Sequence, residues 1–279
     1  MKVPRINEKR YAKPINVKNY DEHGELADMS KLPRQNEVIV VMDSVNYWVF
    51  NQAKTPNCRS IGKAVPAMSH SYYTPPSIEA MFRGAVPQPL DRCYWPYGRY
   101  STAGENVLIP ATMKKKGYNT YLLSSNLLIA VNEICAGKDV VASNINSFQY
   151  EFLNSFKIKS SPDMVQWFLD NVKEPYFVFM LLIETHTPYM GIRGHAGYTM
   201  DNQVKAVEYI DKHLGTLFQG IRSRKRKHKT RVIITADHGE AWSPDGKENG
   251  GHNPKDLHQF IKHDRMKPLT RVFLINGVI

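Results

Sequence analysis

The sequence predicts an α/β protein with a doubly wound, mostly parallel sheet and helices on both faces. Short apolar runs recur along the chain and are continuous rather than alternating, which is typical of strands covered on both faces. Segments with helical spacing of apolar residues lie between these runs. With 279 residues, of which 42% are hydrophobic and 23% charged, the chain is long enough to form one such domain around a large core.

The N-terminal part differs from the rest in composition. Residues 1–35 are polar, contain Pro and Lys, and show no periodicity, so we expect an extended arm there and a single domain over 36–279. The first strand is predicted at 37–43 and ends in an acid, Asp43. The three cysteines of the chain are scattered along it, which argues against a disulfide framework or a thiolate zinc site.

The alternation of strands and helices continues to the end of the chain. Further strands are predicted at 119–125, 175–183, 231–235 and 271–275, and helices at 161–170 and near 201–220. Ser161 and Pro162 fit the cap and the first position of their helix, and Gly117 fits the C-cap of a helix that ends before 119. Strands separated by helices in this way predict parallel pairing.

The charge of the protein is unevenly distributed. The net charge is +11 and the pI is near 9.4, and much of the excess lies in one run at 222–231. Such a run can contact nucleic acid or another anionic polymer. We favour a solvated loop between a helix and a strand, because charge runs usually form solvated surfaces. A basic surface also suits a small anionic substrate.

No targeting segment is recognisable. The N-terminus lacks the apolar stretch of a signal peptide, and the longest purely apolar run, 177–183, is far shorter than the roughly 20 residues of a membrane helix. We therefore expect no transmembrane segment and a cytoplasmic protein.

Side chains that bind metals follow three of the predicted strands. In open parallel sheets the active site lies beyond the carboxyl ends of the strands, where these side chains would meet. They are Asp43 after the first strand, Glu184 and His186 after the strand at 175–183, and Asp237, His238 and Glu240 after the strand at 231–235. Carboxylate and imidazole groups are suitable ligands for zinc, manganese or magnesium.

The segment around Thr74 supplies a hydroxyl group. Two prolines follow Thr74 and precede a helical pattern, which places the threonine near a helix N-terminus. Backbone N–H groups and the helix dipole favour anions there. Metal coordination lowers the pKa of a hydroxyl and makes it a nucleophile, so Thr74 is the candidate for covalent catalysis.

The order of these segments resembles the sulfatase-like branch of the alkaline phosphatase superfamily. The resemblance covers roughly 36–277. The matching stretches are Val40–Ser44, Thr55–Asn57, Thr74–Ser77 with Gly84, Lys116–Thr120, Thr185–Tyr189, Tyr209–Asp211, Thr235–Glu240 and Glu248–His252. The DHGE stretch after an apolar strand is the most specific of them. The resemblance implies a sulfatase-like catalytic domain over 36–279.

The resemblance also implies roles for single residues. Asp43, Asp237 and His238 would be metal ligands, and Thr74 the nucleophile that also contacts the metal. His186 and His252 match the substrate-side histidines of lipid A phosphoethanolamine transferases and lipoteichoic acid synthases. These two histidines would bind the transferred group, protonate the leaving oxygen or hold a second metal.

Glu184 and Glu240 are further candidates, either as ligands or as groups that support the ligands. We expect one metal site, with a second as an alternative. Zinc is the first choice of metal, and manganese, magnesium and calcium are the others.

The predicted function is that of a metal-dependent phosphoester hydrolase or phosphoryl-group transferase with a covalent threonine intermediate. Sulfatases oxidise a Cys or Ser to formylglycine, which Thr74 cannot form, and Ile78 replaces the arginine of their motif. Hydrolysis of a sulfate ester or a phosphonate is the alternative within catalysis. A non-catalytic anion-binding protein is the alternative from another class, because a fold alone does not prove activity.

Overall fold

The computed structural model describes residues 34–69, 71, 72, 74, 77, 78, 81, 109–124, 160–187, 189, 199–242, 251 and 269–279. Gln35–Ile279 make up one compact unit. The elements described in this unit are β1 (Asn36–Met42), α2 (Tyr47–Gln52), α3 (Pro56–Arg59), β2 (Val65–Met68), α5 (Ile109–Lys115), β3 (Asn119–Ser124), α7 (Ser161–Asn171), β4 (Tyr176–Leu182), α8 (Met200–Ser223), β5 (Thr230–Ala236) and β6 (Arg271–Val278). The predicted arm at 1–35 lies outside the described residues except for its last two.

The six described strands form one sheet in the order β2-β6-β5-β1-β4-β3. The central strand β1 pairs in parallel with β4 and β5, and β3 pairs in parallel with β4. All seven residues of β4 are buried, as are six of the seven in β1. Burial of this extent is typical of parallel strands covered on both faces. The predicted doubly wound, mostly parallel sheet is therefore confirmed.

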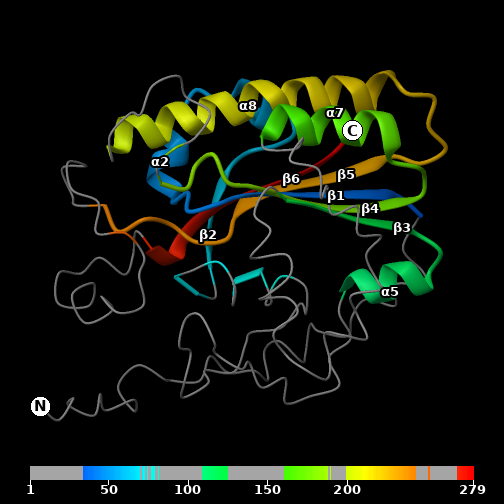
Figure 1. The fold of residues 1–279 in the computed structure, drawn as a ribbon, viewed down its shortest axis with the longest axis horizontal. Helices are drawn as coiled ribbons and strands as arrows, with labels where there is room; N and C mark the ends of the chain where they lie inside the picture. The colour runs from blue at the N-terminus through cyan, green and yellow to red at the C-terminus, as the bar shows by residue number, and fades with distance from the viewer. Residues whose placement is uncertain are drawn as a thin grey trace, which may run out of the picture. The chain divides into compact units, whose positions relative to one another are not determined.

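Helices cover both faces of the sheet. Figure 1 shows α2, α7 and α8 on one face and α5 on the other. The face of α8 that packs inward follows the 3.6-residue period. Its buried residues are Gln203, Ala206, Val207, Ile210, Asp211, Leu214, Leu217, Phe218 and Ile221. The apolar side chains among them join those of the strands in one core cluster, whereas Gln203 and Asp211 are buried polar residues.

Two strands at one side of the sheet differ from the purely parallel pattern. β6 runs antiparallel to β5, and β2 runs antiparallel to β6. The apolar run at 271–275 locates a strand correctly, but periodicity carries no information about strand direction. β2 gives no strand pattern in the sequence, because three of its four residues are exposed and Pro66 interrupts the pattern. α2 and α3 are too short to show helical periodicity and were not predicted.

The turn before β3 has the predicted C-cap. Gly117 has a positive φ of 80°, a conformation that glycine adopts at little cost. Its N–H donates to Lys114 O at 2.9 Å, and the N–H of Tyr118 donates to Met113 O at 3.1 Å. This pair of bonds resembles a Schellman motif and satisfies carbonyls at the end of α5.

The strand register aligns the ends of the four parallel strands. Asn119 is paired with Tyr176, and Asn36 with Thr230, so the first residues of β3, β4, β1 and β5 lie in one row. We call this side of the sheet the amino edge and the opposite side the carboxyl edge. A strand of seven residues is about 20 Å long, which separates the two edges.

Candidate metal centre

Strand register brings two acids together at the carboxyl edge. Met42 and Ala236 are paired, and each is followed directly by an aspartate, Asp43 after β1 and Asp237 after β5. Both aspartates are buried. The N–H of Ser44 donates to Asp237 Oδ1 at 3.0 Å, so the backbone after one strand holds the carboxylate that follows the other.

His238 completes a group of three ligand-type side chains. Its Nε2 lies 3.6 Å from Asp43 Oδ1 and 3.5 Å from Asp237 Oδ2. Its Nδ1 lies 2.8 Å from the carbonyl oxygen of Gly239. Because a carbonyl can only accept a hydrogen bond, Nδ1 of the neutral ring carries the proton and Nε2 keeps its lone pair. A backbone carbonyl that fixes the ring in this way is a common partner of a metal-binding histidine.

The hydroxyl of Thr74 lies beside two of these side chains, His238 and Asp237. Thr74 Oγ1 is 3.1 Å from His238 Nε2, and the residue is buried. Thr74 is helical, as are Ser77, Ile78 and Met81 beyond it. The structure therefore brings together the four residues for which the sequence predicted metal-binding or nucleophilic roles.

The chemistry of this group fits a divalent cation. The ligand atoms of Asp43, Asp237 and His238 all lie within 4.8 Å of one another. Asp237 Oδ2 is buried and accepts no hydrogen bond from the described residues. Burial raises the pKa of Asp237 well above its usual range, and the negative charge of Asp43 raises it further. Two buried carboxylates beside a neutral imidazole lack a positive charge, which a cation would supply.

Gln203 connects the loops that follow β1, β4 and β5. Its Nε2 donates to Ser44 O at 2.9 Å and to Thr185 O at 3.1 Å, and its Oε1 accepts from Trp242 Nε1 at 2.7 Å. The hydroxyl of Thr185 donates in turn to Asp43 O at 2.6 Å. Gln203 is fully buried, and both N–H groups and the oxygen of its amide have partners.

Ser69 connects the segment that carries Thr74 to the end of β5. Its Oγ donates to the carbonyl oxygen of Asp237 and accepts from the N–H of Ser71 at 3.2 Å. The hydroxyl oxygen of Ser77 lies 3.0 Å from Ser69 Oγ. These contacts fix the segment that carries Thr74 relative to Asp237, one of the candidate metal ligands.

Sequence reasoning singled out neither Gln203 nor Ser69. For Gln203 a signal was present, because it occupies a buried position on a helix face that is otherwise mostly apolar. A polar side chain at such a position must have internal partners. For Ser69 there was no comparable signal, since its contacts depend on the fold of a short irregular segment.

His186 follows β4 at the same edge of the sheet. It is partly buried, and its Nδ1 lies 2.7 Å from Thr187 O, which places the proton of the neutral ring on Nδ1. The residue before it, Thr185, bonds to the backbone of Asp43. The residue next to His186 in the chain therefore contacts the metal centre. His186 itself does not belong to the group formed by Asp43, Asp237 and His238.

The remaining candidates lie in different places. Glu184 is buried and accepts from the N–H of Ser161, so it caps the N-terminus of α7, where a negative charge is favourable. Glu240 is also buried, and its carbonyl oxygen accepts from Asn46 Nδ2 at 3.4 Å. Neither glutamate belongs to the group of three among the described residues. His252 lies outside the described residues.

The fold is that of solved structures in the alkaline phosphatase superfamily and of sulfatases. The sequence profile of the family described as Sulfatase matches residues 35–272. This is most of the chain, and the protein belongs to that family. No curated protein sequence matches the chain.

Solved structures with the same fold include transferases and sulfatases. The C-terminal periplasmic domain of EcEptC from Escherichia coli has a TM-score of 0.59 and 14% identity, over 89% of this chain and 73% of that one. The lipoteichoic acid synthase LtaP from Listeria monocytogenes has a TM-score of 0.55 and 14% identity, over 86% and 65%. BT1596, a 2-O GAG sulfatase, has a TM-score of 0.58 and 12% identity, over 88% and 64%. At these identities the similarity shows the fold, and it confirms the predicted resemblance.

The protein therefore has the hydrolase/transferase fold of the sulfatase family, and its structural neighbours include a sulfatase and a phosphoethanolamine transferase. No helix among the described residues has the length and apolarity needed to cross a membrane. The EcEptC structure is a periplasmic domain, and the cytoplasmic location expected from the sequence stays a prediction.

Proposed function

We propose that the protein is a metal-dependent phosphoester hydrolase or phosphoryl-group transferase that forms a covalent intermediate on Thr74. The observation that carries this proposal is the position of Thr74 Oγ1, 3.1 Å from His238 Nε2, in the group that His238 forms with Asp43 and Asp237. A hydroxyl at this place is held where a cation and a substrate phosphate would meet. Asp43, Asp237 and His238 would hold the cation, with Thr74 as a further oxygen ligand.

Zinc is the metal that we propose first. Two carboxylates, an imidazole and a hydroxyl form a mixed oxygen and nitrogen set, which zinc accepts readily and manganese also tolerates. A structure of the EcEptC domain in complex with zinc has the same fold as this chain. When bound, the cation supplies positive charge beside Thr74 Oγ1, which lowers the pKa of the hydroxyl and stabilises charge on the transferred group.

The residues of the chain would act in two half-reactions. Thr74 Oγ1 loses its proton to solvent and forms a bond to phosphorus, while the bond between phosphorus and the leaving oxygen breaks. His186 or His252, in its doubly protonated form, gives a proton to the leaving oxygen and becomes neutral. Water or an acceptor alcohol then bonds to phosphorus and gives a proton to the neutral histidine. The bond from phosphorus to Thr74 breaks, and Thr74 Oγ1 takes a proton from solvent, which restores the hydroxyl.

Two other functions remain as alternatives. Sulfate-ester or phosphonate hydrolysis has the support of the sulfatases that share the fold, although Thr74 cannot be converted to formylglycine. A non-catalytic anion-binding protein would need the fold and the basic surface but no nucleophile. The convergence of a buried hydroxyl with three ligand-type side chains favours catalysis, because a binding protein gains nothing from burying two unneutralised carboxylates.

The test is to trap the intermediate and to measure the metal. The purified protein is analysed for bound metals and then mixed with aryl phosphate, aryl phosphodiester and aryl sulfate substrates. After rapid acid quenching, peptide mass spectrometry reads the group attached to Thr74. A phosphoryl-containing adduct on this residue supports the proposal. An adduct on another residue, or turnover of the aryl sulfate alone, contradicts it.

A further inference from the structure

Ser44 has a backbone conformation that is uncommon for a serine. It follows Asp43 just after β1, is fully buried, and has a φ of 65°. Residues with a Cβ atom rarely adopt this left-handed conformation, which glycine reaches at little cost. Residues held in such conformations cluster at functional sites, so the contacts of Ser44 indicate what the residue does there.

Both hydrogen-bond donors of Ser44 hold a carboxylate of the metal centre. Its N–H donates to Asp237 Oδ1 at 3.0 Å, and its hydroxyl donates to Asp43 Oδ1 at 2.8 Å. An ionised carboxylate can only accept, so the one proton of the hydroxyl is used in this bond. The carbonyl oxygen of Ser44 accepts from Gln203 Nε2 at 2.9 Å. Ser44 therefore links the two acids and is itself held in place by a buried amide.

These bonds decide which carboxylate oxygens face a cation. Asp237 Oδ1 accepts from the N–H of Ser44 at 3.0 Å and from the N–H of His238 at 2.8 Å, which engages both of its lone pairs. Asp237 Oδ2 is buried and receives neither of these bonds. The hydroxyl of Ser44 holds the carboxylate of Asp43 in one rotation about its terminal bond. Asp237 is thus left with a single oxygen for a cation, and Asp43 is fixed in its orientation.

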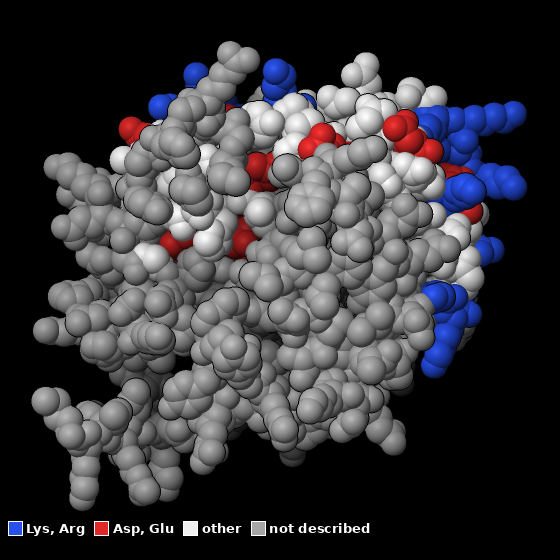
Figure 2. Space-filling model, viewed as in Figure 1, with Lys and Arg blue, Asp and Glu red and all other residues white. Residues whose placement is uncertain are grey.

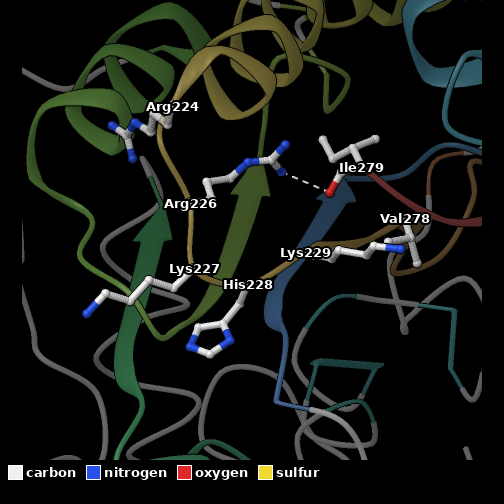
Figure 3. Close-up of a pocket in the computed structure, with 7 residues that line it drawn as sticks. All are labelled: Arg224, Arg226, Lys227, His228, Lys229, Val278 and Ile279. Atoms are coloured by element: carbon white, nitrogen blue, oxygen red, sulfur yellow. Dashed lines mark hydrogen bonds between the residues drawn. The ribbon is translucent and has the colours of Figure 1, made fainter.

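The basic residues of the described chain lie away from these two acids. No Lys or Arg in this part of the chain forms an ion pair with Asp43 or Asp237. Figure 2 shows Lys and Arg gathered on the right of the molecule, the side on which the parallel strands begin in Figure 1. Figure 3 shows Arg226 and Lys227, which lie there in the connection that leads into β5. The length of a strand, about 20 Å, separates this amino edge from the metal centre. From the described residues the two carboxylates therefore receive neutral donors, among them Ser44, rather than cations.

We infer that Ser44 is a positioning residue that restricts Asp43 and Asp237 to one oxygen each toward the bound metal and thereby favours zinc over manganese. The inference rests on the proposed function, because it concerns the same metal centre. Zinc usually takes about four ligands, whereas manganese suits about six oxygen ligands. One oxygen from each aspartate, the imidazole of His238 and the hydroxyl of Thr74 match the smaller number. Second oxygens from the two carboxylates would bring the site toward the larger number.

The test separates the hydroxyl of Ser44 from its backbone. Ser44→Gly removes the hydroxyl and adopts a φ of 65° readily, whereas Ser44→Ala removes the same hydroxyl and keeps the unfavourable backbone. Ser44→Thr keeps a hydroxyl, although a β-branched residue is strained at this φ. Ser161→Ala is the control, because it removes an equally buried hydroxyl that has no hydrogen-bond partner among the described residues.

The affinities of the metal-free, full-length proteins are measured for zinc by competition with a chelating dye and for manganese by electron paramagnetic resonance. Ser44→Gly and Ser44→Ala should both bind zinc about tenfold more weakly, while their manganese affinity changes less than about threefold. Ser44→Thr should keep the zinc-to-manganese ratio within about threefold of the wild type despite a lower melting temperature. Ser161→Ala should keep the wild-type ratio.

Bound cobalt gives a second readout, because its visible absorption weakens when its coordination number rises from about four to about six. The bands should be weaker in Ser44→Gly and Ser44→Ala than in the wild type and Ser161→Ala. Neither readout depends on turnover of a substrate.

The possible results separate this inference from the proposed function. An unchanged zinc-to-manganese ratio in Ser44→Gly and Ser44→Ala would overturn the inference and leave the metal centre intact. A ratio that falls in Ser44→Ala and Ser44→Thr but not in Ser44→Gly would assign the effect to the backbone and overturn it as well. If the wild type bound neither metal, the proposed metal centre would be wrong, and the inference with it. If Ser44→Thr failed to fold, the comparison of Ser44→Gly and Ser44→Ala with Ser161→Ala would decide.

Discussion

Trp242 Nε1 donates to Gln203 Oε1 at 2.7 Å, and through this bond the loop after β5 is joined to the amide that also holds the loops after β1 and β4. The metal-ligand candidates Asp43, Asp237 and His238 lie on two of these loops. A helix residue without any ligand atom in the site therefore fixes the spacing of the ligands. Groups in this position commonly affect metal affinity as much as some ligands do.

Replacing Gln203 by leucine should lower metal affinity by about 10- to 100-fold, although all proposed ligands remain. The leucine fills a similar volume but cannot donate to the carbonyls of Ser44 and Thr185. Competition with a zinc-chelating dye measures the affinity. Gln219→Leu, on an exposed position of the same helix, is the control. A loss of thermal stability with unchanged metal affinity would mean that Gln203 serves the fold alone.

Asp211 should matter for stability and not for the metal. Its carboxylate accepts from the N–H of Asn57 at 3.2 Å, from Asn57 Nδ2 at 2.9 Å and from the N–H of Cys58 at 2.7 Å, so it holds α3 against α8. Asp211→Ala leaves the buried N–H of Cys58 and the partly buried donors of Asn57 without this partner. We expect the free energy of unfolding to fall by about 2–4 kcal/mol, as measured by urea denaturation.

Glu208→Ala is the matched control for Asp211. Glu208 lies one turn earlier on α8. From the described part of the chain it accepts one bond, which comes from the N–H of Lys54 at 2.9 Å in an exposed environment. Its loss should cost less than about 1 kcal/mol. Similar losses for the two variants would show that the three bonds of Asp211 are no stronger than one solvent-exposed bond.

The parts that could be predicted from the sequence are those with long-range regularity. Continuous apolar runs located β1, β4 and β5, and the residues after them supplied Asp43, Asp237 and His238 because parallel strands end at the same edge. Sequence patterns do not encode strand direction, which is why the antiparallel pairing of β6 came only from the structure. Contacts such as those of Gln203 and Ser69 depend on where loops meet in space, and no local pattern specifies that meeting.

Addition of zinc should stabilise the metal-free protein strongly. At a free zinc concentration of about 1,000 times the dissociation constant, the stabilisation is about 4 kcal/mol. For a domain of this size, that corresponds to a rise in melting temperature on the order of 10 °C, measurable by scanning calorimetry. Part of the gain comes from neutralising the repulsion between Asp43 and Asp237, whose ligand oxygens lie within 4.8 Å of each other.

Asp237→Asn separates the stabilisation by bound zinc from the stabilisation that comes from removing the repulsion between Asp43 and Asp237. Without metal the variant should melt at a higher temperature than the metal-free wild type, because one of two adjacent buried negative charges is removed. With zinc it should show little further rise, because a ligand is lost. A variant that responds to zinc as the wild type does would place the metal elsewhere.

Substitution of Thr74 distinguishes a protein nucleophile from a bound water. Thr74→Val keeps the shape of the side chain and removes the hydroxyl that lies 3.1 Å from His238 Nε2. Turnover of a small phosphate ester should be abolished, while zinc binding measured by dye competition should largely persist, because Asp43, Asp237 and His238 remain. Thr74→Ser keeps the hydroxyl and loses only the methyl group that restricts its rotamer, so measurable activity should remain. Exposure of the wild type to a formylglycine-generating enzyme should leave its rate unchanged, since threonine offers no route to that aldehyde. Near-normal turnover by Thr74→Val would require water as the nucleophile, and the covalent mechanism would then be wrong.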